Sequence, residues 1–194
     1  MLSSCQCSGT RELFILETAV TPSNHTHRSS YREILIEHLF VGAVMRMLWL
    51  RGIAQFEVLK PQVDHSGYDL VLEANGIVRH VQLKASASTS ATSRVKASLK
   101  LEKKPSGCVV WIIFDPESLT LGPFRWYVGN PGKPMPDIAG FRIAKHTRAN
   151  SKGVKKERAA QRTIPRAKFE KVDDLRNSYH SCSGSSMSIR PSDS

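Results

Sequence analysis

The sequence predicts an α/β protein in which helices flank a central mixed β-sheet. Three observations predict it: an apolar stretch with helical spacing from Ile34 to Leu50, two strand-like segments joined at Asn75-Gly76, and a continuous apolar run from Cys108 to Phe114. Such a run is typical of a strand that is buried on both faces of a sheet. With 194 residues and 40% hydrophobic content, the chain is long enough to bury one proper core.

The first predicted element is a long helix. Glu33 follows Ser30 by three residues, which is the capping-box arrangement that satisfies the free backbone N–H groups of a first helical turn. We therefore expect the helix to begin near Ser30 and to end at Leu50 or Arg51, because Gly52 supplies a usual helix stop. The apolar stretch contains charged residues and is too short to span a bilayer, so we expect a buried soluble helix and no membrane.

A β-hairpin is the best-defined local structure in the sequence. Asn75-Gly76 is a strong signal for a two-residue turn, and it joins a strand from Tyr68 to Glu73 with a strand from Ile77 to Lys84. A strand-like run at 56–63 and a polar turn at 64–67 come before it. We therefore expect the two hairpin strands to be antiparallel neighbours.

The segments after the hairpin are less regular. A loop rich in Ser, Thr and Ala at 85–93 leads into a basic stretch from Arg94 to Lys104 that is compatible with a helix. A turn at 105–107 then precedes the apolar strand that ends at Phe114, and the segment from Arg125 to Val128 is expected to add another strand.

The chain is expected to consist of one folded core with extensions at both ends. Residues 1–28 show no sustained periodicity and no secretory signal, and we interpret them as a weakly ordered arm. Residues 29–144 form the predicted core, and 145–177 form a basic extension that packs on the core or continues it. The Ser-rich residues 178–194 are expected to be a disordered tail.

The charge of the chain indicates a polyanionic partner. The 28 Lys and Arg residues exceed the 17 Asp and Glu residues and leave a formal charge of +11. Nucleic acid is the first candidate and an anionic membrane surface the second. Charge alone does not separate an enzyme from a passive binder, and a small basic RNA-binding protein of unrelated fold would carry the same excess.

The four cysteines indicate a reducing compartment. They are Cys5, Cys7, Cys108 and Cys182. Their spacing is not that of a secreted disulfide scaffold, so we expect a cytoplasmic protein. Cys5 and Cys7 with His25 and His27 do not match the spacing of structural zinc sites, and Cys108 lies inside the apolar run and is expected to be core.

The hairpin also places polar side chains together. Because side chains alternate faces along a strand, Gln82 and Lys84 lie on one face of their strand while Val81 and Leu83 lie on the other. Asp69 occupies the neighbouring strand. A polar trio can thus converge beside an apolar layer.

These residues resemble the pattern of the PD-(D/E)XK nuclease superfamily, in which an Asp opens the second core strand and an acid-x-Lys closes the third. The matching segments are Gly67-Tyr68-Asp69 and Gln82-Leu83-Lys84, with Tyr68 in place of the Pro and Gln82 in place of the usual acid. The resemblance covers roughly residues 31–114. It implies a restriction-endonuclease-like core. It also implies an endonuclease that depends on Mg²⁺, or alternatively on Mn²⁺, and hydrolyses phosphodiester bonds, with DNA as the first expected substrate.

The resemblance also implies roles for four residues. Asp69 would anchor the metal, Gln82 would give its amide oxygen, and Lys84 would lie next to the nucleophilic water. The family tends to carry a Glu on the preceding helix, and Glu37 is the candidate for a further catalytic metal ligand, ahead of Glu33. A hard cation prefers such oxygen ligands, and developing charge on phosphorus needs cations placed beforehand.

Each of these residues also has a structural interpretation. Asp69 could close a turn by accepting backbone N–H groups after Gly67. Gln82 and Lys84 could form the solvent face of a half-buried strand. Glu37 could form a buried ion pair with Arg79 or another base. Since Gln82 removes one negative charge from the site, a non-catalytic nucleic-acid binder on the same fold is the alternative function.

Contacts to nucleic acid are expected from two basic lines and one serine. Ser86 follows Lys84 on the same strand face. The predicted nucleic-acid contacts are Ser86, Arg94, Lys96, Lys100, Lys152, Lys155, Lys156, Arg158 and Arg162. Many members of the resembled family act as homodimers, so a second copy of the chain is also a candidate partner.

Overall fold

A computed structural model describes residues 29–63, 66–146, 151 and 153–175. The N-terminal arm at 1–28 and the Ser-rich tail at 178–194 lie outside the described residues. The elements are α2 (Ser29–Trp49), β1 (Phe56–Leu59), β2 (Leu70–Ala74), β3 (Ile77–Ala87), β4 (Arg94–Ser98), α3 (Leu99–Glu102), β5 (Gly107–Phe114), β6 (Leu121–Val128), β7 (Ile143–Lys145), β8 (Glu157–Pro165), the 3-10 turn η1 (Arg166–Lys168) and β9 (Glu170–Val172).

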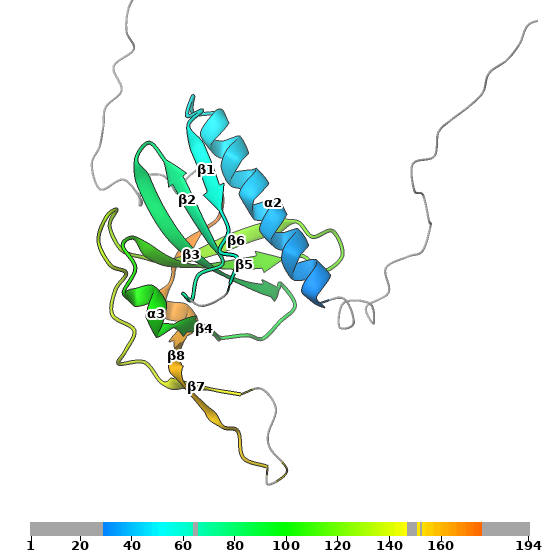
Figure 1. The fold of residues 1–194 in the computed structure, drawn as a ribbon. Coiled ribbons are helices and arrows are strands. Elements are labelled where there is room, and N and C mark those ends of the chain that lie inside the picture. The colour runs from blue at the N-terminus through cyan, green and yellow to red at the C-terminus, as the bar shows by residue number, and fades with distance from the viewer. Residues whose placement is uncertain (1–28, 64–65, 147–150, 152, 176–194) are drawn as a thin grey trace, which may run out of the picture.

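The main sheet is mixed, as the sequence predicts. Its six strands have the order β1-β2-β3-β5-β6-β9. β3 and β5 run parallel and are connected through β4 and α3, whereas the other neighbouring strands run antiparallel. The predicted α/β class is therefore confirmed (Figure 1).

Helix α2 packs across one face of this sheet (Figure 1). Its buried residues are Ile36, Phe40, Val44 and Leu48. They recur every four positions, so they form one apolar stripe along the helix. The ring of Phe40 lies 6.2 Å from that of Phe124 and 6.5 Å from that of Trp126. The helix bounds agree with the prediction, and Gly52 follows with a φ of +73° that favours glycine.

The opposite face of the main sheet is covered by a second sheet of three strands with the order β4-β8-β7. A second core fills the space between the two sheets, and it includes Val95, Ala97, Trp111 and Ile164. The helix expected over Arg94–Lys104 is wrong for its first half, because Arg94–Ser98 is strand β4. The physical reason is a two-residue period: Val95 and Ala97 face the core, whereas Arg94 and Lys96, which alternate with them, do not.

The β2–β3 hairpin has the expected turn. Asn75 and Gly76 have φ values of 49° and 74°, and positive φ at both central residues defines the turn that matches the twist of hairpin strands. Leu70 pairs with Val81. β2 begins at Leu70, two residues later than expected, and β3 continues to Ala87, beyond the expected end at Lys84.

The described part of the basic segment joins both sheets. β8 lies between β4 and β7 in the small sheet, and β9 pairs with β6 at the edge of the main sheet. The first residues of β8, which lie beyond its pairing with β4, form with β7 an arm that extends away from α2 (Figure 1). None of the described helices combines the length and apolar character that crossing a membrane requires.

Candidate active-site cleft

A cleft of about 500 Å³ opens between the N-terminal half of α2 and the strands β3 and β5. Asp69, Lys84 and Glu37 all line it, as does Glu33. Three of the four residues assigned to the site from the sequence thus border one space, although they come from the helix and from two strand segments. Apolar side chains such as Leu83 form the remaining wall.

The carboxylate of Asp69 is oriented by the backbone of β3. Its Oδ2 accepts a hydrogen bond from the N–H of Leu83 at 2.6 Å, and its own N–H donates to the carbonyl of Val81 at 2.8 Å. The side chain therefore continues the β2–β3 ladder by one bond beyond the backbone of β2. This contact explains why regular pairing begins only at Leu70. It agrees with the structural interpretation of Asp69, in which the carboxylate accepts a backbone N–H group.

Glu37 forms an ion pair with Lys60. The distance from Lys60 Nζ to Glu37 Oε1 is 2.5 Å, and the Glu37 side chain is 16% exposed. Arg79, the base named as a partner from the sequence, donates instead to the carbonyl of Gly129 at 2.7 Å. The cost of placing a carboxylate beside the apolar stripe of α2 is thus offset by a different base.

Gln82 does not line the cleft. It is buried, and its Oε1 accepts a hydrogen bond from the N–H of Ser98 at 3.1 Å, which ties β3 to the end of β4. Gly67 lies against Ser98: a Cβ at Gly67 would be 2.6 Å from Ser98 Cβ, and the φ of +77° also favours glycine. Gln82, Ser98 and Gly67 therefore form one tightly packed junction, two residues before Lys84 on the same strand.

The donor set of the cleft fits a hard cation that keeps most of its waters. Among the residues that the structure describes, no three His, Cys, Asp or Glu side chains gather as a closed metal cage. The cleft does offer the carboxylates of Asp69 and Glu37, and Mg²⁺ is commonly held by one or two carboxylates together with substrate phosphates. An open oxygen site is thus compatible with these residues, whereas a closed structural site is not.

A group of cations connects the cleft with the small sheet. Burial lowers the pKa of Lys96 from its usual 10.5, and the positive charges of three neighbours lower it further. These neighbours are Arg158, Lys155 and Lys84. Lys84 lines the cleft, Arg158 lies on β8 and Lys155 just before it, so Lys96 on β4 interacts with positive charges of both regions.

The other predicted nucleic-acid contacts differ in their surroundings. Arg94, Lys100 and Lys156 are exposed, and Lys152 lies outside the described residues. The hydroxyl of Ser86 accepts a hydrogen bond from Trp111 Nε1 at 3.0 Å.

Arg162 is tied to the protein itself. Its Nε donates to the carbonyl of Ala139 at 3.0 Å, and its Nη1 donates to that of Ala159 at 2.8 Å. The structure therefore gives Ser86 and Arg162 internal roles that their position in the sequence does not show.

Sequence reasoning missed Lys60 and Ser98. Lys60 follows β1 and reaches Glu37 on the helix, and Ser98 ends β4 and reaches Gln82 on β3. Nothing local distinguishes either residue, because both contacts join segments that meet only in the tertiary fold. The glycine at position 67 is itself a weak sequence signal for the close approach of this backbone to Ser98.

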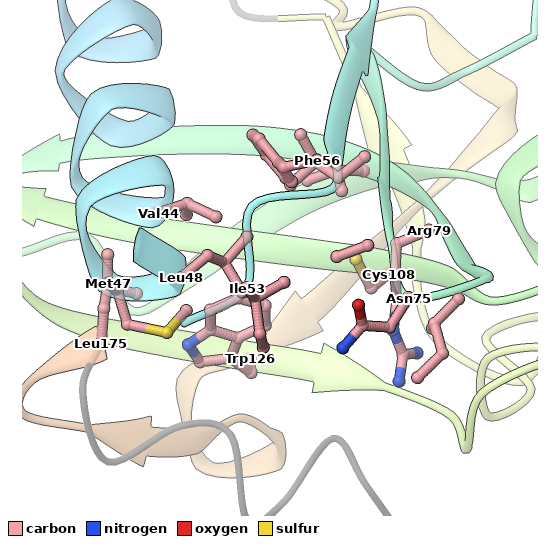
Figure 2. Close-up of a pocket in the computed structure, with 14 residues that line it drawn as sticks. Val44, Met47, Leu48, Ile53, Phe56, Asn75, Arg79, Cys108, Trp126 and Leu175 are labelled. Atoms are coloured by element: carbon pink, nitrogen blue, oxygen red, sulfur yellow. The ribbon is translucent and has the colours of Figure 1, made fainter. Parts of the chain in front are cut away.

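A second hollow of about 120 Å³ lies at the other end of α2 (Figure 2). Leu48, Ile53 and Trp126 line it, and Arg79 lies at one side. Cys108 is fully buried there, which confirms its predicted place in the core. The lining is mostly apolar and lacks the grouped carboxylates of the first cleft, so we base the candidate site on the first cleft.

Among known proteins, one solved structure is similar to part of this chain. No protein-family model and no curated protein matches the sequence. The solved structure of a bacterial homing endonuclease, I-Ssp6803I, is similar to this chain with 27% identity, over 46% of this chain and 57% of that chain, at a TM-score of 0.25. The match spans less than two thirds of that chain.

Proposed function

We propose that this protein is a metal-dependent endonuclease that hydrolyses phosphodiester bonds of DNA at the cleft lined by Asp69, Glu37 and Lys84. The observation that carries the proposal is that Asp69, Glu37 and Lys84 all border a single cleft. Lys84 at the cleft also belongs to a group of cations with Lys96, Lys155 and Arg158, and such a group suits a polyanion. The resemblance of the same residues to the PD-(D/E)XK pattern supports the assignment.

Each residue has a defined task in this proposal. Asp69 and Glu37 would hold Mg²⁺ or Mn²⁺, with the carboxylate of Asp69 already oriented by the Leu83 N–H. The bound metal would supply a Lewis acid and a water of lowered pKa. Lys84 would donate a hydrogen bond to the attacking water or to a phosphate oxygen, where its positive charge stabilises the developing negative charge on phosphorus.

Cleavage of supercoiled plasmid by the full chain tests this function. We expect Mg²⁺-dependent nicking or linearisation that chelator abolishes and that Lys84→Ala lowers at least about 100-fold, as is usual when a transition-state electrostatic contact is removed. Lys171→Ala is the matched control, because Lys171 lies on β9 and pairs with Asp173 at 2.6 Å. Equal cleavage by wild type and Lys84→Ala would contradict the assigned site.

One observation favours a second candidate, a non-catalytic nucleic-acid binder on the same fold. Each candidate ligand already has a partner within the chain: Asp69 with Leu83, Glu37 with Lys60, and Gln82 with Ser98. If wild type cleaves no plasmid with any divalent metal but binds DNA with strong salt dependence, this second candidate replaces the first.

A further inference from the structure

The arm formed by β7 and β8 has the shape of a groove-reading ribbon. Its strands are antiparallel, with Lys145 opposite Glu157 and Ala144 opposite Arg158. The first four residues of β8, Glu157–Ala160, are all exposed. Figure 1 shows this part of β8 extending away from the body of the protein. A two-stranded ribbon of this kind fits the width of the DNA major groove.

The ribbon contains a bulge that is built into the fold. Ile143 pairs with Arg162 and the next residue, Ala144, pairs with Arg158, so residues 159–161 of β8 are extra relative to β7. The guanidinium of Arg162 donates to the carbonyls of Ala159 and Gln161, two residues of the bulge. Bulges of this type re-aim side chains and are frequent next to active sites.

The bulge brings together two side chains that can read bases. Arg158 Nη1 donates to Gln161 Oε1 at 3.3 Å, and Arg158 is exposed. Arg pairs with guanine and Gln pairs with adenine through two hydrogen bonds each in the major groove. The residues between them, Ala159 and Ala160, are small and exposed, so they permit a close approach to base edges.

The surrounding charges supply the remaining contacts that a duplex requires. Lys155 and Lys156 are exposed just before β8, and the cationic group continues through Lys96 to Lys84 at the cleft. Phosphate contacts fix the position of a protein on DNA, whereas base contacts provide sequence selection. The arm contains both kinds of side chain.

We propose that the bulged part of β8 enters the major groove of the bound duplex, with Arg158 and Gln161 as the residues that determine sequence specificity and Lys155 and Lys156 as phosphate contacts. This inference deepens the proposed function, since it rests on DNA as the substrate. It assigns sequence selection to the arm and hydrolysis to the cleft.

Selection from a random duplex library tests the inference without requiring cleavage. The full chain, in chelator and about 0.15 M salt, is used to enrich duplexes with a random central segment, and the bound DNA is sequenced. We expect the wild type to enrich a motif, and Arg158→Ala and Gln161→Ala each to remove about 5- to 150-fold preference at a different base pair. The matched control Lys156→Ala should weaken binding to all sequences and keep the motif.

The outcomes separate this inference from the nuclease proposal. A motif that Arg158→Ala and Gln161→Ala alter supports the inference even if plasmid is never cleaved. A wild type that enriches no motif, or variants that retain the full wild-type motif, overturn it even if plasmid is cleaved. None of the three substituted residues is among the buried ones, and circular dichroism verifies that each variant is folded.

Discussion

At the scale of single residues, the pKa of Lys96 responds to the positive charges around it. Its pKa is lowered first by burial and then by Arg158, Lys155 and Lys84. Removing one of these charges should therefore raise the pKa of Lys96 toward 10.5, and binding of a polyanion should raise it too.

We predict that Arg158→Ala raises the pKa of Lys96, measured by NMR titration of its side chain, while Lys171→Ala leaves it unchanged. Because the native pKa lies below that of the unfolded chain, the unfolded state binds more protons between the two values. The contribution of Lys96 to stability is then fully present above pH 10.5 and is lost as pH falls through the native pKa. Arg158→Ala should narrow the pH range between the native pKa of Lys96 and 10.5. An unchanged pKa would show that the charges of Lys96 and Arg158 do not interact.

Gln82 tests whether the missing acid limits metal binding. In Gln82→Glu, a carboxylate oxygen can still accept the Ser98 N–H, so the fold should be kept, while one negative charge is added beside the cleft. We predict that the affinity for Mg²⁺ alone, measured by isothermal titration calorimetry, rises about tenfold, because ligand charge tunes affinity for hard cations. Gln55→Glu, in an exposed loop, is the control. An affinity that both substitutions leave unchanged would show that the charge of residue 82 does not affect metal binding.

At the scale of elements, the packing of its buried stripe stabilises α2, although not every residue of the helix has a high helix propensity. Gly42 lies in the helix interior, and a Cβ there would meet nothing within 4 Å. Glycine in such a position is less favourable than alanine because it loses more backbone freedom on folding. The surrounding packing does not require glycine at this position.

We therefore predict that Gly42→Ala raises the free energy of unfolding by about 0.5–1 kcal/mol in urea denaturation. Gly107→Ala is the opposite case, because its Cβ would lie 2.5 Å from the carbonyl oxygen of Leu101, and it should destabilise by about 1–3 kcal/mol. A loss of stability in Gly42→Ala would indicate that the outer face of α2 is covered in solution.

At the scale of the whole molecule, the charge of +11 is organised rather than spread evenly. Lys84 at the cleft, Lys96 on β4, and Lys155 and Arg158 at the start of β8 form one group of cations, and Lys171 on edge strand β9 lies outside this group and pairs with Asp173. Binding of a duplex along this surface would release counterions in proportion to the phosphates contacted.

We predict that the double variant Lys155→Ala/Lys156→Ala lowers the slope of log affinity against log salt by about 1.8, because each lost phosphate contact contributes about 0.9. Fluorescence anisotropy with a labelled duplex measures the slope, and Lys171→Ala should keep the wild-type value. If the double variant has an unchanged slope, the arm does not contact phosphates. The homodimer that the resemblance implies stays a prediction, for which the molar mass in solution is the measurement.

What the sequence determined by itself was local. The helix and the hairpin follow from contacts within a few residues: the four-residue spacing of Ile36, Phe40, Val44 and Leu48, and the positive φ that Asn75-Gly76 supplies at low cost. The apolar run of β5 likewise predicts a strand that is buried on both faces. Asp69 and Lys84 were placed near one another because their strands share that hairpin.

Only the tertiary structure decided which partner each polar group meets. Arg94–Ser98 is a strand because β8 supplies its ladder, although its composition suits a helix. Glu37 is neutralised by Lys60, Gln82 is bonded to Ser98, and the bulge that pairs Arg158 with Gln161 depends on the register of β7. These contacts join segments distant in sequence, and their partners are selected by sheet order and packing, which no local pattern encodes.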